Sequence, residues 1–169
     1  EDHPGLATPL HRLGVALRGL GRHTEALEVL NRARAIVERW GGPDDSLFFL
    51  IDIAITHASN GEIESAVQLL DDVLSRHFAD REGDLRTIGS AVQWLGLLLA
   101  RMDQNQEAFP NFREGLGLAT RMTRQVLPSL SESATHAYLS TVEWHFDSFY
   151  RFTRTYAPEA PDIAGDLYD

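Results

Sequence analysis

The amino-acid sequence predicts an all-α protein, an α-solenoid of stacked antiparallel helix hairpins followed by one long aromatic helix. Two observations predict this fold. A small residue follows each of three turns, at Ala26, Ala66 and Ala108, which lie 40 and then 42 residues apart. Apolar residues also recur at helical spacing on both sides of each turn. Repeats of this length stack side by side and form an extended concave wall.

The first hairpin is expected at about 7–40. Thr8 is a candidate cap for its first helix, and Gly14 lies where the partner helix is expected to come closest. Gly21-Arg22-His23 forms the turn. Gly41-Gly42-Pro43 ends the second helix, because glycine and proline terminate helical segments.

Two further hairpins, at about 47–80 and 89–127, repeat this pattern with turns at Asn60-Gly61 and Asp103-Gln104-Asn105. A polar link at 79–84 separates them. Together the three hairpins make residues 1–127 one repeat region. In chain order, the expected helices lie near 8–20, 24–40, 46–59, 62–78, 85–102 and 106–127.

This pattern resembles the tetratricopeptide repeat, in which small and bulky residues alternate at fixed places on two helices. The long spacing resembles the kinesin-light-chain subtype, and residues 1–8 are similar to the loop between its repeats. The resemblance implies that the chain begins between two repeats and that at least one more lies upstream. The matching residues are Leu10, Leu13, Gly14, Leu17, Ala26, Leu30 and Ala33, then Leu50, Ile53, Ala54, His57, Ala66, Leu70 and Val73, then Val92, Leu95, Gly96, Leu99, Ala108 and Phe112, with Gly115 in place of the last alanine.

The resemblance implies a concave partner-binding face on the first helix of each hairpin. Its middle row, Val15, Ile55 and Leu97, is apolar, which suits a partner helix, a neighbouring domain or self-association. Repeats that bind the C-terminal carboxylate of chaperones carry Asn and Lys in such rows, so that role is excluded. The alternative is that superhelical curvature buries these residues. The face comprises His11, Val15, Arg18, Ile51, Ile55, Gln93, Leu97 and Arg101.

After residue 127 the pattern changes. Ser129 and Glu132 form a candidate capping box for a long capping or connecting helix at 128–156. Residues 157–169 are expected to be a linker and the start of a truncated helix. One side of the long helix is expected to carry Tyr138, Val142, Phe146, Phe149, Phe152 and Tyr156.

Three pieces of this region resemble the stretch before the catalytic domain of bacterial CHAT proteins, which are caspase-like peptidases. They are 127–132, the aromatic helix and 164–169. The resemblance implies that the catalytic His and Cys lie in a downstream domain, because this chain contains no cysteine. An ordinary capping helix over the last repeat explains the same residues, and the two interpretations are compatible.

Charge and composition reduce the number of function classes to consider. The formal charge of −10 repels phosphate backbones, so nucleic acid is not an expected ligand. The apolar runs at 48–55 and 94–100 are shorter than the roughly 20 residues that cross a bilayer, so no membrane association is expected. No signal peptide is visible, and a cytoplasmic location is expected. The absence of cysteine excludes thiolate metal sites and a cysteine nucleophile within the chain.

The histidines do not indicate a metal site. No pair has the i, i+4 spacing of a helical zinc site, and His136 and His145 lie on opposite sides of a helix. Ser129 and Ser131 are better explained as helix caps than as nucleophiles. We therefore expect no catalytic residue, metal or cofactor in this chain.

The leading hypothesis is a protein–protein interaction module. It would be the sensing or docking arm of a CHAT peptidase, and its partner would be a protein, a peptide or the downstream domain of the same parent. The alternative is a stand-alone scaffold or adaptor without a protease. A third hypothesis is an enzyme that binds a small molecule with the groove residues His11, Arg18 or Arg101.

Overall fold

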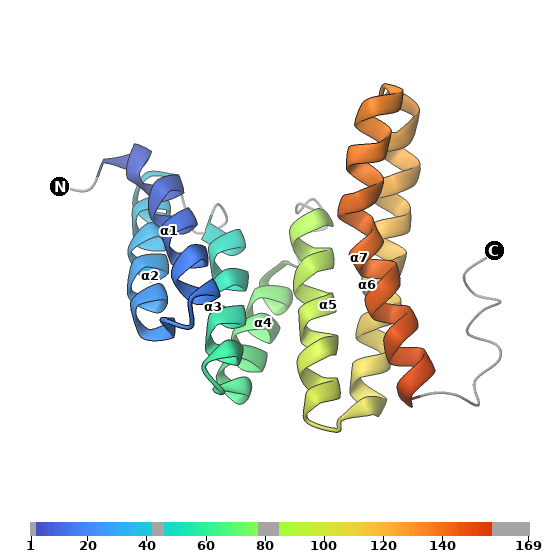
Figure 1. Ribbon diagram of the computed structural model, residues 1–169, viewed down its shortest axis with the longest axis horizontal. Coiled ribbons are helices and arrows are strands. Elements are labelled where there is room, and N and C mark those ends of the chain that lie inside the picture. The colour runs from blue at the N-terminus through green and yellow to red at the C-terminus, as the bar shows by residue number, and fades with distance from the viewer. Residues whose placement is uncertain (1–2, 42–45, 78–84, 157–169) are drawn as a thin grey trace.

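The computed structural model describes residues 3–41, 46–77 and 85–156. Within these ranges the chain forms seven α-helices stacked in one row (Figure 1). The expected link at 79–84 and the expected linker and helix at 157–169 lie outside the described residues. The hairpins are α1 (Ala7–Gly19) with α2 (His23–Trp40), α3 (Leu47–Ser59) with α4 (Ile63–His77), and α5 (Leu85–Arg101) with α6 (Asn105–Val126), and α7 (Glu132–Tyr156) follows them.

The three turns share one backbone geometry. Gly21, Gly61 and Asp103 have φ of 75°, 87° and 60°, and they lie 40 and then 42 residues apart, as the alanines do. In each turn the next amide donates back to a carbonyl in the last turn of the first helix, over 3.0 Å from Arg22 to Leu17 and over 2.9 Å in the other two. This bond is the longer one of the Schellman motif, which ends helices at a left-handed residue. Asp replaces Gly in the third turn because Asp tolerates this conformation better than most residues.

The hairpins close at the small residues that the sequence identified. Ala26, Ala66 and Ala108 are fully buried. A Cβ atom on Gly14 would lie 2.5 Å from Leu30 Cγ, closer than real contacts allow, and one on Gly96 would lie 3.2 Å from the Phe112 ring. Glycine at these two positions therefore sets how closely the helices of the first and third hairpins approach.

The core is unevenly divided along the row. One large apolar cluster runs through α3, α4, α5 and α6 and continues into α7. The first hairpin shares a smaller cluster, Ala7, Ala33, Ile36 and Phe49, with α3. The apolar contact between the first and second hairpins is therefore separate from the large cluster, with Leu10 and Val37 also packed on it.

The beginning of α1 differs from the prediction. Thr8 does not cap the helix, because α1 already begins at Ala7 and follows a short 3₁₀ helix, η1 (Pro4–Leu6). The side chain of His3 caps η1 by accepting a hydrogen bond from the Gly5 amide. At the third hairpin, α5 begins at Leu85, where the helix expected at 85–102 begins, although the repeat boundary was expected at 89.

The start of α7 also differs. Ser129 lies in a second 3₁₀ helix, η3 (Leu127–Ser129), and its hydroxyl donates to the Val126 carbonyl. The predicted capping box with Glu132 is therefore wrong. Ser131 precedes α7, and its oxygen lies 3.4 Å from the Ala134 amide, which is the N-cap interaction.

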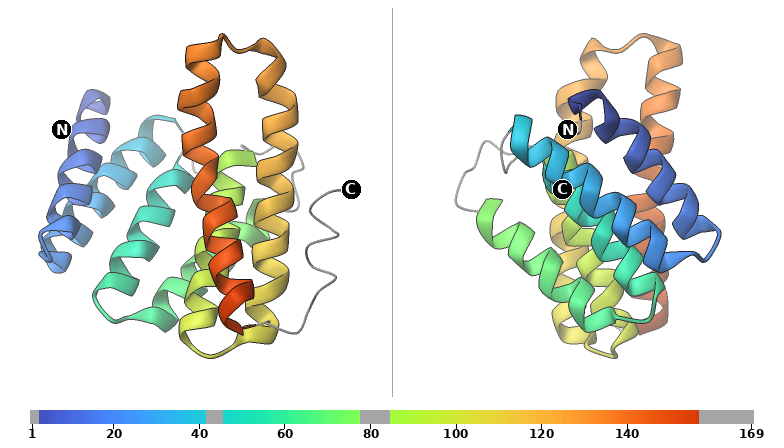
Figure 2. Two further views of the ribbon diagram at one scale, coloured as in Figure 1. Left: turned by 45° about the vertical axis from the view of Figure 1, so that its right-hand side comes forward. Right: turned by 90° about the vertical axis from the view of Figure 1, so that its left-hand side faces the viewer.

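Helix α7 runs beside α6, and both extend past the end of α5 (Figure 2). Its buried side chains are Val142, Ser148, Phe149 and Phe152. The ring of Phe152 stacks on Phe112 at a centroid distance of 4.5 Å. Phe146 was expected on this side, but it is 42% exposed and lies at the edge of the buried side, about 40° from Val142 around the helix. No helix in the described parts of the chain is both long and apolar enough to span a bilayer.

Candidate functional site

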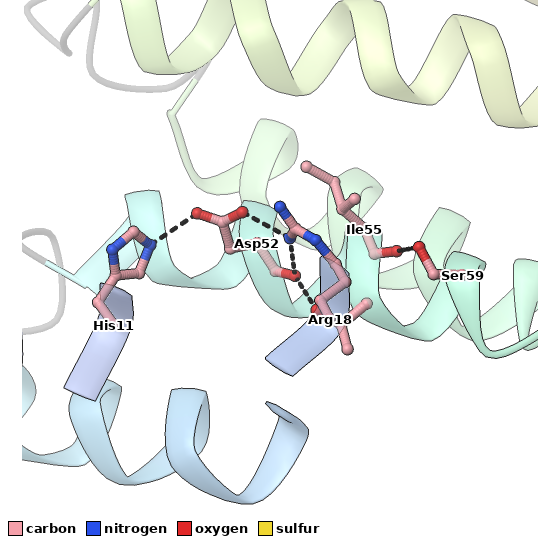
Figure 3. Close-up of polar contacts among 6 residues, drawn as sticks. His11, Arg18, Asp52, Ile55 and Ser59 are labelled. Atoms are coloured by element: carbon pink, nitrogen blue, oxygen red, sulfur yellow. Dashed lines mark hydrogen bonds and ion pairs between the residues drawn. The ribbon is translucent and has the colours of Figure 1, made fainter. Parts of the chain in front are cut away.

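The predicted face contains a polar cluster that joins the first two hairpins, formed by His11, Arg18 and Asp52. His11 and Arg18 are seven residues apart on α1, so they lie on one side of that helix. Asp52 is on α3, within the apolar segment at 47–55. Its side chain reaches back toward α1 between them (Figure 3).

Both oxygens of the Asp52 carboxylate are used. Oδ2 lies 2.7 Å from His11 Nε2, and Oδ1 accepts a 2.7 Å hydrogen bond from Arg18 Nη1. The same Arg18 nitrogen also donates to the Asp52 main-chain carbonyl over 3.2 Å. The three side chains are only 12–19% exposed, so water screens these charges less than at an open surface.

The surroundings hold the cluster in place. The His11 ring lies 4.8 Å from the Phe48 ring and 5.1 Å from the Phe49 ring, measured between centroids. The Thr56 hydroxyl donates to the Asp52 carbonyl over 2.7 Å. Hydrogen bonds to a charged group contribute about 1.5–3 kcal/mol each. The cluster therefore acts as a clamp between the two hairpins, beside the smaller apolar cluster.

The hydrogen bonds around His11 and Arg18 do not favour the hypothesis of an enzyme that uses these two side chains. An Asp–His pair activates a nucleophile only if a hydroxyl or thiol proton can reach the imidazole. The Thr56 hydroxyl gives its proton to a main-chain carbonyl instead. Arg18 donates to Asp52, so its Nη1 group is not available to a ligand.

Sequence reasoning missed Asp52, although a signal was present. A carboxylate inside an apolar helix is costly to bury unless it is paired, so it predicts a partner cation. Asp52 is such a residue, with Ile51 and Ile53 beside it. The sequence could not show that the cation would come from the preceding hairpin.

The other residues expected on the binding face differ in how deeply they are buried. Ile51 is 5% exposed and Gln93 is 2% exposed, so neither offers surface to a partner. The amide of Gln93 instead donates to the Trp144 carbonyl of α7 over 3.3 Å. The structure corrects the prediction for these two residues, because the neighbouring helices already cover them.

The middle row of the expected binding face is partly exposed to solvent. Val15, Ile55 and Leu97 are half-buried, and Ile55 and Leu97 pack on the large apolar cluster. Figure 3 shows Ile55 on α3 next to the polar cluster. One helix from each hairpin contributes a residue, so the row has the spacing of successive repeats.

A pocket of about 210 Å³ lies at the far end of this row. Leu97, Ala100 and Arg101 of α5 line it together with Phe112 of α6, and α7 closes it with Ser148, Arg151, Phe152 and Thr155. Its walls are thus apolar, and two guanidinium groups and two hydroxyl groups lie at its edge. Arg151 pairs with Asp147 over 2.9 Å, whereas Arg101 is exposed and has no ion pair among the described residues.

Two comparisons with known proteins agree with this fold, and a third found no match. Residues 2–77 match the tetratricopeptide repeat family. A search of the curated proteins gave no match. Two crystal structures are similar, both of nearly identical TPR-like repeats from a Podosopora anserina protein assigned as a kinesin light chain.

The first of these structures has a TM-score of 0.60 and 17% sequence identity, covering 99% of this chain and 82% of the other. The second has a TM-score of 0.57 and 15% identity, covering 99% and 95%. At this identity the likeness concerns the fold alone. The predicted all-α solenoid of TPR-like hairpins is therefore confirmed.

Proposed function

Since residues 2–77 carry tetratricopeptide repeats and the chain folds as a TPR-like solenoid, we propose that it is a protein–protein interaction module. TPR repeats generally mediate such interactions. The proposed binding face is the row Val15, Ile55 and Leu97, continued by the pocket beside Arg101. The polar cluster of His11, Arg18 and Asp52 has a supporting role, because it fixes the first hairpin against the second.

One observation carries the proposal. Apolar side chains from three successive hairpins remain half-buried along one row, and the row ends at a pocket beside Arg101, which has no ion pair within the described residues. Partly exposed apolar rows with few polar groups are typical of grooves that bind a peptide or a helix. The free guanidinium of Arg101 would favour a partner with a carboxylate near its apolar anchor.

The test uses affinity capture from a native lysate with quantitative mass spectrometry. Arg101→Glu reverses the charge at the pocket, and Arg113→Glu makes the same change at an exposed position on α6 that lies outside the row. We expect Arg101→Glu to lose specific partners that wild type and Arg113→Glu retain. Equal capture by both variants, with unchanged circular dichroism, would contradict the proposed face.

A finer part of the proposal concerns the parent protein. We infer that the chain is the sensing or docking arm of a bacterial CHAT peptidase, on the basis of the resemblance at 127–132 and along α7. The third piece of that resemblance, 164–169, lies outside the described residues. The alternative is a stand-alone scaffold.

Sequencing the parent gene past Asp169 distinguishes the two. The peptidase proposal expects a downstream domain of alternating strands and helices that carries a separated His and Cys. A stop codon or further 40-residue repeats would refute it and favour the scaffold. Either result leaves the test with Arg101→Glu unaffected.

A further inference from the structure

The last helix, α7, has an apolar face that packs against no other helix in the described part of the chain. In each hairpin the first helix packs against its own second helix, and α3 and α5 also pack against the hairpin before them. Helix α7 packs on α6 and α5 in the position of a further first helix, but no described helix follows it (Figure 2). One side of α7 is therefore unpartnered in the described part of the chain.

That side carries a stripe of large apolar residues. Leu139 is 41% exposed, Phe146 is 42% exposed and Tyr150 is 63% exposed. At 100° per residue these three side chains fall within about 40° of one another around α7. They are three of the eight exposed large hydrophobic residues of the described chain, as many as lie in and beside α1.

The stripe does not suit another TPR-type partner helix. In the first and third hairpins the partner helix comes close because Gly14 and Gly96 have no side chain. The exposed stripe of α7 has aromatic rings at its centre and contains no glycine or alanine. A helix that binds this stripe must therefore pack at a larger interaxial distance from α7, with its side chains against those of α7.

Two charged residues border one edge of the stripe. Glu143 and Arg154 are eleven residues apart, so they lie within about 20° of one another but about 16 Å apart along the helix. They cannot reach each other within one chain. Both are exposed, and neither has an ion pair among the described residues.

This charge pattern is self-complementary. When two copies of a helix pair antiparallel, the same edge of each lies against the other. If the copies cross near Ser148, Phe146 of one meets Tyr150 of the other, and Glu143 of each comes near Arg154 of its counterpart. In a parallel pair the same edges lie on opposite sides of the interface, so Glu143 and Arg154 of the two copies could not pair.

We propose that the face of α7 formed by Leu139, Phe146, Tyr150, Glu143 and Arg154 binds a second copy of this chain in antiparallel orientation. The interface is isologous, so the two-fold axis passes between the two α7 helices. Both binding faces remain separate, because the row of Val15, Ile55 and Leu97 comes from the first helices of the hairpins. The dimer would present two partner-binding rows.

The test is analytical ultracentrifugation of the 169-residue chain over a concentration series. Wild type is expected to move from monomer to dimer as concentration rises. Phe146→Ala with Tyr150→Ala should weaken the dimer about tenfold or more, since buried aromatic anchors dominate such interfaces. Leu20→Ala removes an exposed apolar residue directly after α1 and should leave the dimer unchanged.

A charge exchange tests the orientation. Glu143→Arg alone and Arg154→Glu alone should each prevent dimer formation, because each places like charges opposite one another twice. An equal mixture of the two variants should restore a dimer, because every pair is then of opposite charge. Loss of folding could not produce this rescue.

Three results would overturn the proposal. The first is a wild-type chain that stays monomeric at every concentration. The second is a dimer that the double alanine variant does not weaken. The third is a mixture of the charge variants that remains monomeric while the wild type dimerises.

Discussion

Glycine packing inside the hairpins gives the sharpest stability prediction. Replacing a helical glycine by alanine stabilises an open helix position by about 1 kcal/mol, since alanine has the higher helix propensity. The same change adds a Cβ atom, which must fit among its neighbours. Gly14 and Gly117 separate the two effects, because both lie inside helices but differ in the space around them.

The distances from each added Cβ atom to its neighbours determine the expected change in the free energy of unfolding. A Cβ on Gly14 would lie 2.5 Å from Leu30 Cγ and 2.7 Å from its Cδ2, and Leu30 is fully buried. Overpacking a filled core costs about 1–3 kcal/mol, so Gly14→Ala should lose up to about 2 kcal/mol after the helix gain. A Cβ on Gly117 meets nothing within 4 Å, so Gly117→Ala should gain about 1 kcal/mol.

The assay is thermal unfolding followed by circular dichroism at 222 nm. For a chain of this length each kcal/mol shifts the melting temperature by about 2–4 °C, so the two variants should differ by about 2–12 °C. Gly96→Ala should fall between them, because its nearest neighbour would be 3.2 Å away. If Gly14→Ala melts as high as Gly117→Ala, the assigned contact between α1 and α2 is wrong.

Three further predictions concern charge and capping. Asp52→Ala should cost about 2–3 kcal/mol in urea unfolding, because the partly buried Arg18 guanidinium and the His11 ring lose their partner; a change below 0.5 kcal/mol would mean that no clamp exists. Burial, followed by two neighbouring carboxylates, raises the pKa of Asp71, so its ionised form opposes folding, and stability should rise as pH falls from above this raised pKa to the usual pKa. Asp71→Asn should therefore raise the melting temperature at pH 7 but not at pH 3, and a gain that is equal at both would exclude this cause. Ser131→Ala should destabilise α7 by about 0.5–1 kcal/mol, whereas Ser129→Ala should have a smaller effect; the reverse order would restore the capping box.

The repeat pattern made the hairpins predictable from the sequence. Small residues after the turns have one structural cause, the close approach of two helices, and Ala26 and Ala66 are both fully buried. The turns were equally clear, because Gly21 and Gly61 adopt backbone angles that few other residues tolerate. These signals are local and recur at a fixed period.

Contacts between hairpins were less predictable, because they depend on how the repeats rotate against one another. The helical pattern placed His11 and Arg18 on a concave face, but only the packing of α1 on α3 shows that Asp52 binds both. Similarly, Gln93 is buried because α7 returns over it. The sequence places a residue on a side of its helix, but the neighbouring helix decides whether that side meets solvent.

Site-specific photo-cross-linking tests the central claim most directly, namely that the row of Val15, Ile55 and Leu97 binds a protein partner. A benzoylphenylalanine side chain would replace Ile55, and a control would carry it at Gln68, which is exposed on α4. In cells that express the native protein, we expect Ile55 to cross-link one discrete partner protein and Gln68 to give none. A folded protein that yields no cross-link at Ile55, or the same products at both positions, would contradict the account.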